Sequence, residues 1–375
     1  MACKLLIASA SAGAGHERAA SALKKAFDAS RQDGSAEAVD SLKYMSGFFR
    51  ALYLRSYYSA IGKAPWYWRH IYRSWDRKPP GGLQRRVVSA FDRLNAGRLL
   101  RLVRSQKFSH VICTHFLPAE IMAWMRKTGR LDAPVGVAVT DYDAHSMWMN
   151  DGTDLYFVAS DDLRELFISK GIEPDRVIAT GIPVDPAFAE RSEQKAVRAE
   201  LRLDQDMPTV LVVAGGAGPG GMKEIVSALS ASGPIQILAV ARHDRKLRQE
   251  LEQLPLPDGV RLAAYGFVDF MPRLMAASDL IVTKPGGMST TECLAMGLPM
   301  VLTVPIPGQE EKNSAFLISC GAAVAASDPE VVRRAASELL GHRQRLDRMK
   351  LSAQSAARPR AAFDIIEATM SLVSP

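Results

Sequence analysis

Short apolar runs alternate with stretches of helical periodicity along the whole chain. This alternation is typical of parallel β-sheets whose strands are joined by crossover helices. The runs form two successive series, so we expect an α/β protein with two Rossmann-like sheets. The first series predicts strands at 4–9, 36–40, 110–114, 134–140, 155–159 and 177–179, and the second at 209–214, 235–241, 260–264, 280–283, 299–303 and 322–325.

A segment that fits neither pattern separates the two series. It runs from Gly181 to Pro186, and its two prolines fix the backbone and disfavour a helix. We therefore place the boundary between two domains there, with the first domain at 1–184 and the second beginning at 185. After Pro359 the pattern is helical again to the end of the chain.

Charge is concentrated in one segment. The 375 residues carry a net charge of +7, but residues 43–107 hold 15 Lys/Arg against two acids, which gives +13. The other 310 residues, with 32 basic and 38 acidic side chains, carry −6. The segment interrupts the first domain between its second and third strands and contains 12 of the 27 aromatic residues.

Aromatic rings interleaved with cations predict an anionic partner, either phospholipid headgroups or nucleic acid. We expect no nucleic acid, because no known RNA or DNA module accompanies the segment. An ordinary helical core with a solvated arginine face is the alternative. The side chains expected to meet a membrane or a lipid acceptor are Trp66, Trp68, Arg69, Arg73, Trp75 and Arg77.

Neither the apolar runs nor the cysteines indicate a membrane-spanning or secreted protein. No run approaches the roughly 18 apolar residues of a spanning helix, so we expect any membrane contact to be peripheral. The four cysteines lack CxxC spacing and mostly lie in apolar runs. Such thiols are typical of a reducing compartment.

The first apolar run ends in a glycine turn that begins an alanine-rich helical pattern. The turn, Ser11-Ala12-Gly13-Ala14-Gly15-His16, lacks the full spacing of a dinucleotide fingerprint. Free N–H groups at such a helix start can bind an anion or a hydroxyl. The positive end of the helix dipole disfavours a protonated His16, which predicts a neutral imidazole able to accept a proton. A histidine that caps the helix or packs in the core is the alternative.

A glycine-rich segment follows the first strand of the second series. Five glycines lie between 215 and 221, among them Gly216 and Gly218. They allow the backbone to approach a phosphate closely, or they form a plain tight turn.

The strongest motif follows the strand at 280–283. Gly287 lies at the start of a helix whose Ser289, Thr290 and backbone N–H groups can hold a diphosphate without a metal. Glu292 lies one turn further, where a carboxylate can accept both hydroxyls of a ribose. The alternative is a helix cap with a solvated glutamate. That alternative leaves unexplained the polar loop at 308–313, which directly follows the next strand.

With these motifs the chain resembles glycosyltransferase family 28, and within it the monogalactosyldiacylglycerol synthases and processive diacylglycerol glucosyltransferases. Residues 11–20 are similar to the family's N-terminal element, and 266–313 to its nucleotide-sugar signature. The resemblance implies a GT-B fold of two Rossmann-like domains facing a cleft. It assigns acceptor and membrane docking to 1–184, with a C-terminal helix at 358–375 crossing back, and UDP-sugar binding to 185–357.

The resemblance implies transfer of a hexose from UDP-glucose or UDP-galactose to a lipid acceptor, diacylglycerol or glycosyldiacylglycerol. The resemblance also implies inversion of the anomeric centre, and we expect neither a metal nor any other cofactor beyond the UDP-sugar substrate. We expect a cytoplasmic enzyme, peripheral on the anionic inner face of the plasma membrane. An undecaprenyl-linked or other lipid acceptor, or a UDP-sugar 2-epimerase-like reaction, is the alternative.

The resemblance also carries the donor site onto individual positions. It implies that Phe267 and Val268 flank the uracil and that Glu292 binds the ribose. His243 departs from the family pattern, which leaves its role open. The full set of residues expected to bind the nucleotide sugar is Gly216, Gly218, Arg242, Phe267, Val268, Gly287, Met288, Ser289, Thr290, Glu292, Gln309, Glu310 and Asn313.

Acid–base chemistry is expected in the first domain. His16 is the candidate base for the acceptor hydroxyl. Asp141 and His145 follow the fourth strand and are similar to a family element that lines the active site, which implies that they assist the base or bind acceptor hydroxyls. Capping of the loop by the aspartate is the alternative. Asp141 and Asp143 also form a DxD pair that suits Mg²⁺ or Mn²⁺, but we favour no metal here.

Overall fold

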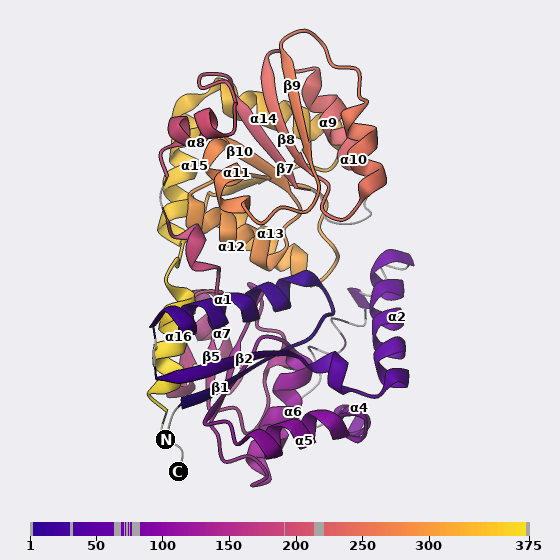
Figure 1. Cartoon of the computed structure of the whole chain (residues 1–375), viewed down its shortest axis with the longest axis vertical. Coiled ribbons are helices and arrows are strands. Elements are labelled where there is room, and N and C mark those ends of the chain that lie inside the picture. The colour runs from indigo at the N-terminus through magenta and orange to yellow at the C-terminus, as the bar shows by residue number, and fades with distance from the viewer. Residues whose placement is uncertain are drawn as a thin grey trace. The chain divides into compact units, whose positions relative to one another are not determined.

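The computed structural model describes residues 3–30, 33–63, 69–70, 72, 74, 76, 83–190, 192–213 and 221–372. The chain divides into two compact units. The first comprises 1–186, 307–309 and 358–375, and the second 187–306 and 310–357. The boundary expected after 184 lies two residues before this division. Figure 1 shows a sheet with its own helices in each unit.

A six-stranded sheet, all of whose described pairings are parallel, forms the centre of the first unit, in the order β2-β1-β3-β4-β5-β6. Its inner strands are mostly buried and apolar, as expected where helices cover both faces. The strands are β1 Cys3–Ser9, β2 Gly34–Asp40, β3 His110–Cys113, β4 Val135–Ala138, β5 Leu155–Phe157 and β6 Val177–Ile178.

The helices of the first unit include one from the far end of the chain. Leu23 and Phe27 of the first helix pack with Ile365 and Ile366 of the last in one hydrophobic core, and Figure 1 shows these two helices beside the sheet. The elements are α1 Ala14–Ser30, η1 Ser41–Tyr44, α2 Gly47–Lys63, α4 Leu83–Asn95, α5 Gly97–Gln106, α6 Phe116–Lys127, η2 Ser146–Trp148, α7 Asp161–Ser169, η3 Pro174–Arg176 and α16 Ala361–Met370.

The C-terminal segment is held against the first unit by a close backbone approach. Gly181 has φ +95°, and a Cβ added there would lie 2.4 Å from Cβ of Arg358. Only glycine fits both the conformation and the space. The guanidinium of Arg358 also pairs with Asp161 at 2.8 Å. The helix expected near the end of the chain therefore packs on the first sheet.

The second unit is built on another parallel six-stranded sheet, in the order β12-β11-β10-β7-β8-β9. Its main core lies between this sheet and helices that include α9 and α14, where Val226 and Leu229 pack near Ala336 and Leu339. The strands are β7 Thr209–Val213, β8 Ile235–Val240, β9 Val260–Tyr265, β10 Leu280–Thr283, β11 Met300–Leu302 and β12 Ala323–Ala325. The helices are η4 Pro186–Phe188, α8 Gln194–Glu200, α9 Met222–Ser230, α10 Arg245–Glu252, α11 Met271–Ala277, α12 Gly287–Met296, α13 Gln309–Ser319, α14 Pro329–Gly341 and α15 Arg343–Ala356.

The predicted α/β class with two Rossmann-like sheets is confirmed. Each of the predicted strands is present, with its ends within two residues of those expected. The basic segment at 43–107 lies between β2 and β3, as expected, and its described elements are part of η1, with α2, α4 and α5.

Candidate functional site

The strand order of the first sheet sets where its chemistry lies. The chain runs from β1 to one neighbour, β2, and then back to the other neighbour, β3. In open parallel sheets, ligands bind at the carboxyl ends of the strands, beside such a switch in direction. His16 follows β1, Thr114 and His115 follow β3, and Thr140 follows β4. The sequence-predicted base therefore lies at the switch point of its sheet.

Hydrogen bonds fix the tautomer of His16. Gly13, with φ +102°, turns the chain from β1 into α1. The Nδ1 atom of His16 lies 2.9 Å from the carbonyl oxygen of Thr114 and 2.9 Å from the hydroxyl oxygen of Thr140. A carbonyl can only accept a hydrogen bond, so Nδ1 carries the proton and Nε2 holds the lone pair.

The charge state of His16 follows from its surroundings. Burial lowers the pKa of His16 to about 4, although the carbonyl of Thr114 acts in the opposite direction and the side chain keeps some exposure to solvent. The imidazole is therefore neutral at pH 7. No described residue hydrogen-bonds Nε2 of His16. A neutral ring with one unprotonated nitrogen can accept a proton.

A second histidine, His115, lies against the first. Its ring meets that of His16 edge-on, with 4.5 Å between centroids. Its Nδ1 atom accepts the N–H of Leu117 at 3.0 Å and caps α6, so the neutral ring carries its proton on Nε2. Burial, with a further contribution from His16, lowers the pKa of His115 well below its usual value. The sequence motifs do not identify His115. Only its position after a strand beside β1 does.

The predicted pair Asp141 and His145 lies in the loop after β4, and both side chains are buried. His145 uses both ring nitrogens: Nδ1 accepts the N–H of Met147 at 3.2 Å, and Nε2 donates to the carbonyl of Tyr72 at 2.9 Å. The hydroxyl of Tyr72 in turn donates to Asp143 at 2.9 Å. In this arrangement His145 organises the loop and has no free nitrogen to act as a base.

The second sheet has its switch point between β7 and β10. The glycine-rich segment follows β7, and α12 begins after the neighbouring β10. Gly286 caps α12 and has no side chain that could bond to the first backbone N–H groups of the helix. A helix start of this kind favours an anion.

Side chains from α13 support the start of α12. One carboxylate oxygen of Glu310 pairs with the ammonium of Lys284 at 2.8 Å, and the other accepts the N–H of Ile306 at 2.8 Å. The side-chain amide of Asn313 donates to the carbonyl of Pro285 at 3.1 Å. Glu310 and Asn313 are buried, and they tie together the loops after β10 and β11.

The predicted phosphate and ribose residues lie on α12. Glu292 is buried, and Ser289 is half-buried. The hydroxyl of Thr290 lies 3.0 Å from the carbonyl of Gly286 and 3.1 Å from that of Gly287, to which it donates within the helix. Its single proton is therefore already used within the helix. To hold a phosphate, the Thr290 hydroxyl has to replace this hydrogen bond with one to the phosphate. Met288 and Gly287 are buried, while Gln309 is half-buried.

An exposed aromatic pair lies beyond the ends of β8 and β9. The ring of Phe267, 65% exposed, stacks on His243 with 5.0 Å between centroids and 8° between the planes. Arg242, before His243, is exposed and adopts a left-handed φ of +56°, and Val268 is half-buried. Thus His243, whose role the sequence left open, is the stacking partner of Phe267.

Several predicted residues lie outside the described part of the chain. These are Gly216, Gly218, Trp66, Trp68, Arg73, Trp75 and Arg77. Arg69 is described and is exposed. No three His, Cys, Asp or Glu side chains of the described residues form a group that could hold a metal ion. No described helix is long and apolar enough to cross a membrane.

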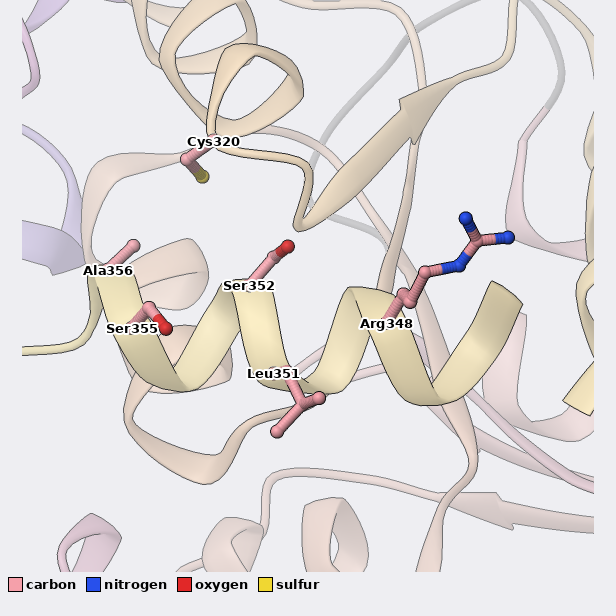
Figure 2. Close-up of a pocket in the computed structure, with 6 residues that line it drawn as sticks. All are labelled: Cys320, Arg348, Leu351, Ser352, Ser355 and Ala356. Atoms are coloured by element: carbon pink, nitrogen blue, oxygen red, sulfur yellow. The ribbon is translucent and has the colours of Figure 1, made fainter. Parts of the chain in front are cut away.

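Two surface cavities lie away from these residues. One, of about 590 Å³, is lined by Cys320 and by residues of α15, and Figure 2 shows Cys320 opposite that helix. The other, of about 610 Å³, lies between η1 and α5. Neither contains a sequence-predicted site residue.

Two family models match the chain in succession. Residues 16–184 match the model described as monogalactosyldiacylglycerol (MGDG) synthase. Residues 210–364 match the model described as the glycosyltransferase family 28 C-terminal domain. Together the two matches span most of both units.

Relatives and solved structures agree with these matches. A processive diacylglycerol beta-glucosyltransferase of Bacillus cereus (strain B4264) is 28% identical over 374 residues, which are 98% of this chain and 93% of the relative. One of Bacillus pumilus (strain SAFR-032) is 29% identical, covering 97% and 94%. The fold is similar to that of Acinetobacter baumannii MurG (TM-score 0.65, 16% identity, covering 99% and 100%) and of Anabaena Alr3699/HepE in complex with UDP and glucose (TM-score 0.58, 16% identity, covering 99% and 100%).

Proposed function

We propose that the chain, whose residues 16–184 match the monogalactosyldiacylglycerol synthase model and whose residues 210–364 match the glycosyltransferase family 28 C-terminal model, transfers a hexose from a UDP-sugar to a diacylglycerol or glycosyldiacylglycerol. The relatives over nearly the full length are named as diacylglycerol glucosyltransferases, which favours UDP-glucose over UDP-galactose. The solved UDP complexes share the GT-B fold, and the lipid acceptor rests on the relatives' names.

The observation that carries the proposal is the state of His16: neutral, with its proton held on Nδ1 by Thr114 and its lone pair on Nε2. In the proposed step Nε2 takes the proton of the acceptor hydroxyl. The hydroxyl oxygen then forms its bond to the anomeric carbon as the bond from that carbon to the diphosphate breaks, and the electron pair leaves on UDP. A single displacement of this kind inverts the anomeric centre. General base catalysis contributes about 10² to 10⁴ in rate.

Charge develops on the departing diphosphate, and we assign its stabilisation to the start of α12. The uncapped N–H groups after Gly286 supply donors and the positive end of the helix dipole. Glu310 and Asn313 hold this turn in place through Lys284, Ile306 and Pro285. The uracil stacks on Phe267, whose other neighbour is His243. No metal enters this scheme.

His115 is the proposed acceptor-positioning residue. Its ring lies edge-on to that of His16, and no described residue accepts from its Nε2–H. A hydroxyl oxygen that accepts from His115 can direct its own proton to His16. The two histidines thus offer opposite tautomers to one hydroxyl, one as donor and one as base.

We further propose that the enzyme acts as a peripheral protein on the inner face of the plasma membrane. The support is the +13 segment at 43–107, which an anionic surface would attract. Diacylglycerol is a membrane lipid, so a transferase that acts on it must reach the interface.

The test uses the full chain with UDP-glucose or UDP-galactose and diacylglycerol in mixed micelles. We expect UDP release that depends on diacylglycerol, a glycolipid by mass spectrometry and a β-linked product by NMR. Unchanged turnover in excess EDTA supports the metal-free scheme, whereas strict Mg²⁺ dependence returns Asp141 and Asp143 as metal ligands. Transfer only to an undecaprenyl-linked acceptor, or interconversion of UDP-sugar epimers without acceptor, contradicts the proposal.

A further inference from the structure

Aromatic rings contact the two histidines that are proposed to meet the acceptor. The ring of Trp148, in η2, lies 6.3 Å from that of His16, measured between centroids. The ring of His115 has Phe116 of α6 at 4.1 Å and Tyr53 of α2 at 6.5 Å. The plane of Tyr53 makes an angle of 65° with that of His115, which is an edge contact of the kind that aromatic pairs favour. Three separate elements therefore place rings against the histidines.

Tyr53 is the ring that comes from the basic segment at 43–107. Phe49 precedes it by four residues, so both lie on the same side of α2. Phe49 is 3% exposed and stacks on Tyr53, with 5.6 Å between centroids and 23° between the planes. Phe49 also contacts Phe91 of α4 at 5.6 Å. The place of the Tyr53 ring is thus supported by α2 and α4 of its own segment.

Tyr53 shields His115 from solvent. His115 is 1% exposed, whereas Tyr53, in contact with it, is half-buried. A ring that touches a buried side chain and also meets solvent lies between the two. Replacement of this ring by a methyl group leaves space next to polar nitrogen atoms, which is the kind of space that water fills.

The partners that the two histidines offer suit an alcohol better than water. A lipid hydroxyl has one proton, which it can give to Nε2 of His16, and its oxygen can accept from Nε2 of His115. Water has a second proton, and the carbon atoms of the neighbouring rings cannot accept it. A polar group that is left unpaired in a dry site is costly. Once further water enters, that second proton has an acceptor and the disadvantage of water disappears.

We propose that Tyr53 determines the specificity of the transferase for a lipid hydroxyl over water, by keeping solvent from His16 and His115. The inference rests on the proposed function, since it concerns the acceptor that meets the base. In the reaction that Tyr53 suppresses, the oxygen of water bonds to the anomeric carbon and one water proton passes to Nε2 of His16. The bond from that carbon to the diphosphate breaks, its electron pair leaves on UDP, and the products are glucose and UDP. Enzymes commonly exclude water from a reacting centre to prevent such side reactions.

The experiment measures glycolipid and free glucose formed by the full chain from UDP-glucose and diacylglycerol in mixed micelles. Tyr53→Ala should raise the ratio of glucose to glycolipid about tenfold, the effect expected when one missing hydrogen bond is supplied. Tyr53→Phe keeps the ring and should keep the parent's ratio. The matched control is Phe48→Ala, which removes a ring that is 72% exposed from the same helix and should also keep the parent's ratio.

The ratio of the two products does not depend on how much of the enzyme is folded, because the same folded molecules form both. A variant that merely destabilises α2 lowers both products together. Tyr53→Leu, which keeps an apolar side chain of intermediate size, should give a ratio between those of the parent and Tyr53→Ala. An unchanged ratio in Tyr53→Ala, or an equal rise in Phe48→Ala or Tyr53→Phe, overturns the inference.

Failure of the proposed function has a different signature, which is a parent that forms no glycolipid. Release of glucose without lipid then decides the role of Tyr53. Faster release by Tyr53→Ala than by the parent supports the exclusion of water by this ring, whereas equal release, or none from either protein, overturns it.

Discussion

A base whose pKa is about 4 makes the proposed transferase unusually tolerant of acid. The perturbation is the pH of the assay, lowered from 7 to 5. Burial disfavours the imidazolium of His16, so the neutral form persists until the pH approaches the lowered pKa. The kinetic constant to follow is kcat/KM for the UDP-sugar, since it reports the enzyme before the donor binds. The donor does not titrate here, because each of its two phosphates carries one ester and one anhydride bond and keeps only one strongly acidic hydroxyl.

The magnitude follows from the fraction of unprotonated imidazole. With a pKa of about 4, about 90% of His16 is still neutral at pH 5, and kcat/KM should fall by only about one tenth. With an unperturbed pKa of about 6.5, about 3% would be neutral at pH 5, and kcat/KM would fall about 25-fold. The two cases differ by more than a factor of twenty, which a steady-state assay resolves easily.

Stability has to be followed in the same pH range. The folded pKa of His16 is below the unfolded value, so the unfolded chain binds more protons between these two values. The stabilising contribution is complete above the unfolded pKa and is lost as the pH falls toward the folded one. From pH 7 to pH 5 the loss is about 2 kcal/mol for this group. Thermal unfolding at each pH shows whether the enzyme is still folded under the assay conditions.

Two variants test whether the pH profile of kcat/KM reports the protonation of His16. His16→Gln should reduce turnover by about 10² or more while UDP affinity stays nearly unchanged. His342→Gln, at an exposed histidine in the second unit, should leave the pH profile as it is. A 25-fold fall in kcat/KM of the still-folded parent at pH 5, or full turnover of His16→Gln, would refute the reasoning.

Three further predictions concern His115 beside the proposed base, Phe267 at the proposed uracil site and Glu310 at the start of α12. His115→Phe should raise KM for the lipid acceptor about tenfold and leave hydrolysis of UDP-glucose by water unchanged, whereas His115→Asn, which keeps a cap acceptor and an N–H donor, should restore most of the loss. Phe267→Leu should weaken UDP binding about tenfold in calorimetry through lost stacking, with a smaller loss for His243→Ala; equal affinities would exclude the stacked pair from the uracil site. Glu310→Gln should lower the free energy of unfolding by about 1–2 kcal/mol in urea because the bond to Lys284 is weakened, and a variant as stable as the parent would show that this contact does not support the start of α12.

The sequence predicts the framework well because the strands are buried on both faces. Leu5 to Ala8 and Ile237 to Val240 are buried apolar runs, as expected for strands covered on both faces. Pro183 and Pro186 mark the boundary between the two series of strands, because each proline fixes its own backbone and disfavours a helix. The positions of His16 after β1 and of Gly287 after β10 follow from the same local patterns.

The fine chemistry of the site depends on contacts between residues far apart in the chain. The tautomer of His16 is set by Thr114 and Thr140, which lie 98 and 124 residues away. His145 looks like a second base in the sequence, but its nitrogens bond to Met147 and Tyr72. No periodicity or motif encodes such pairings; they arise only when strand order places the loops after β1, β3 and β4 together.

Because His16 is a weak base, the proposed reaction depends strongly on the donor. An imidazole with a pKa of about 4 in the free enzyme gains little by taking the proton of an alcohol. The proposed displacement, however, requires the acceptor oxygen to reach both Nε2 of His16 and the anomeric carbon, which would bring the diphosphate within a few bonds of that oxygen. Its negative charges favour the imidazolium and should raise the pKa of His16. The base is thus strengthened only when the donor is bound. The acid limb of kcat/KM for the acceptor, measured with saturating UDP-sugar, should therefore lie at higher pH than the limb for the donor, and coincident limbs would mean that the diphosphate charge does not reach the base.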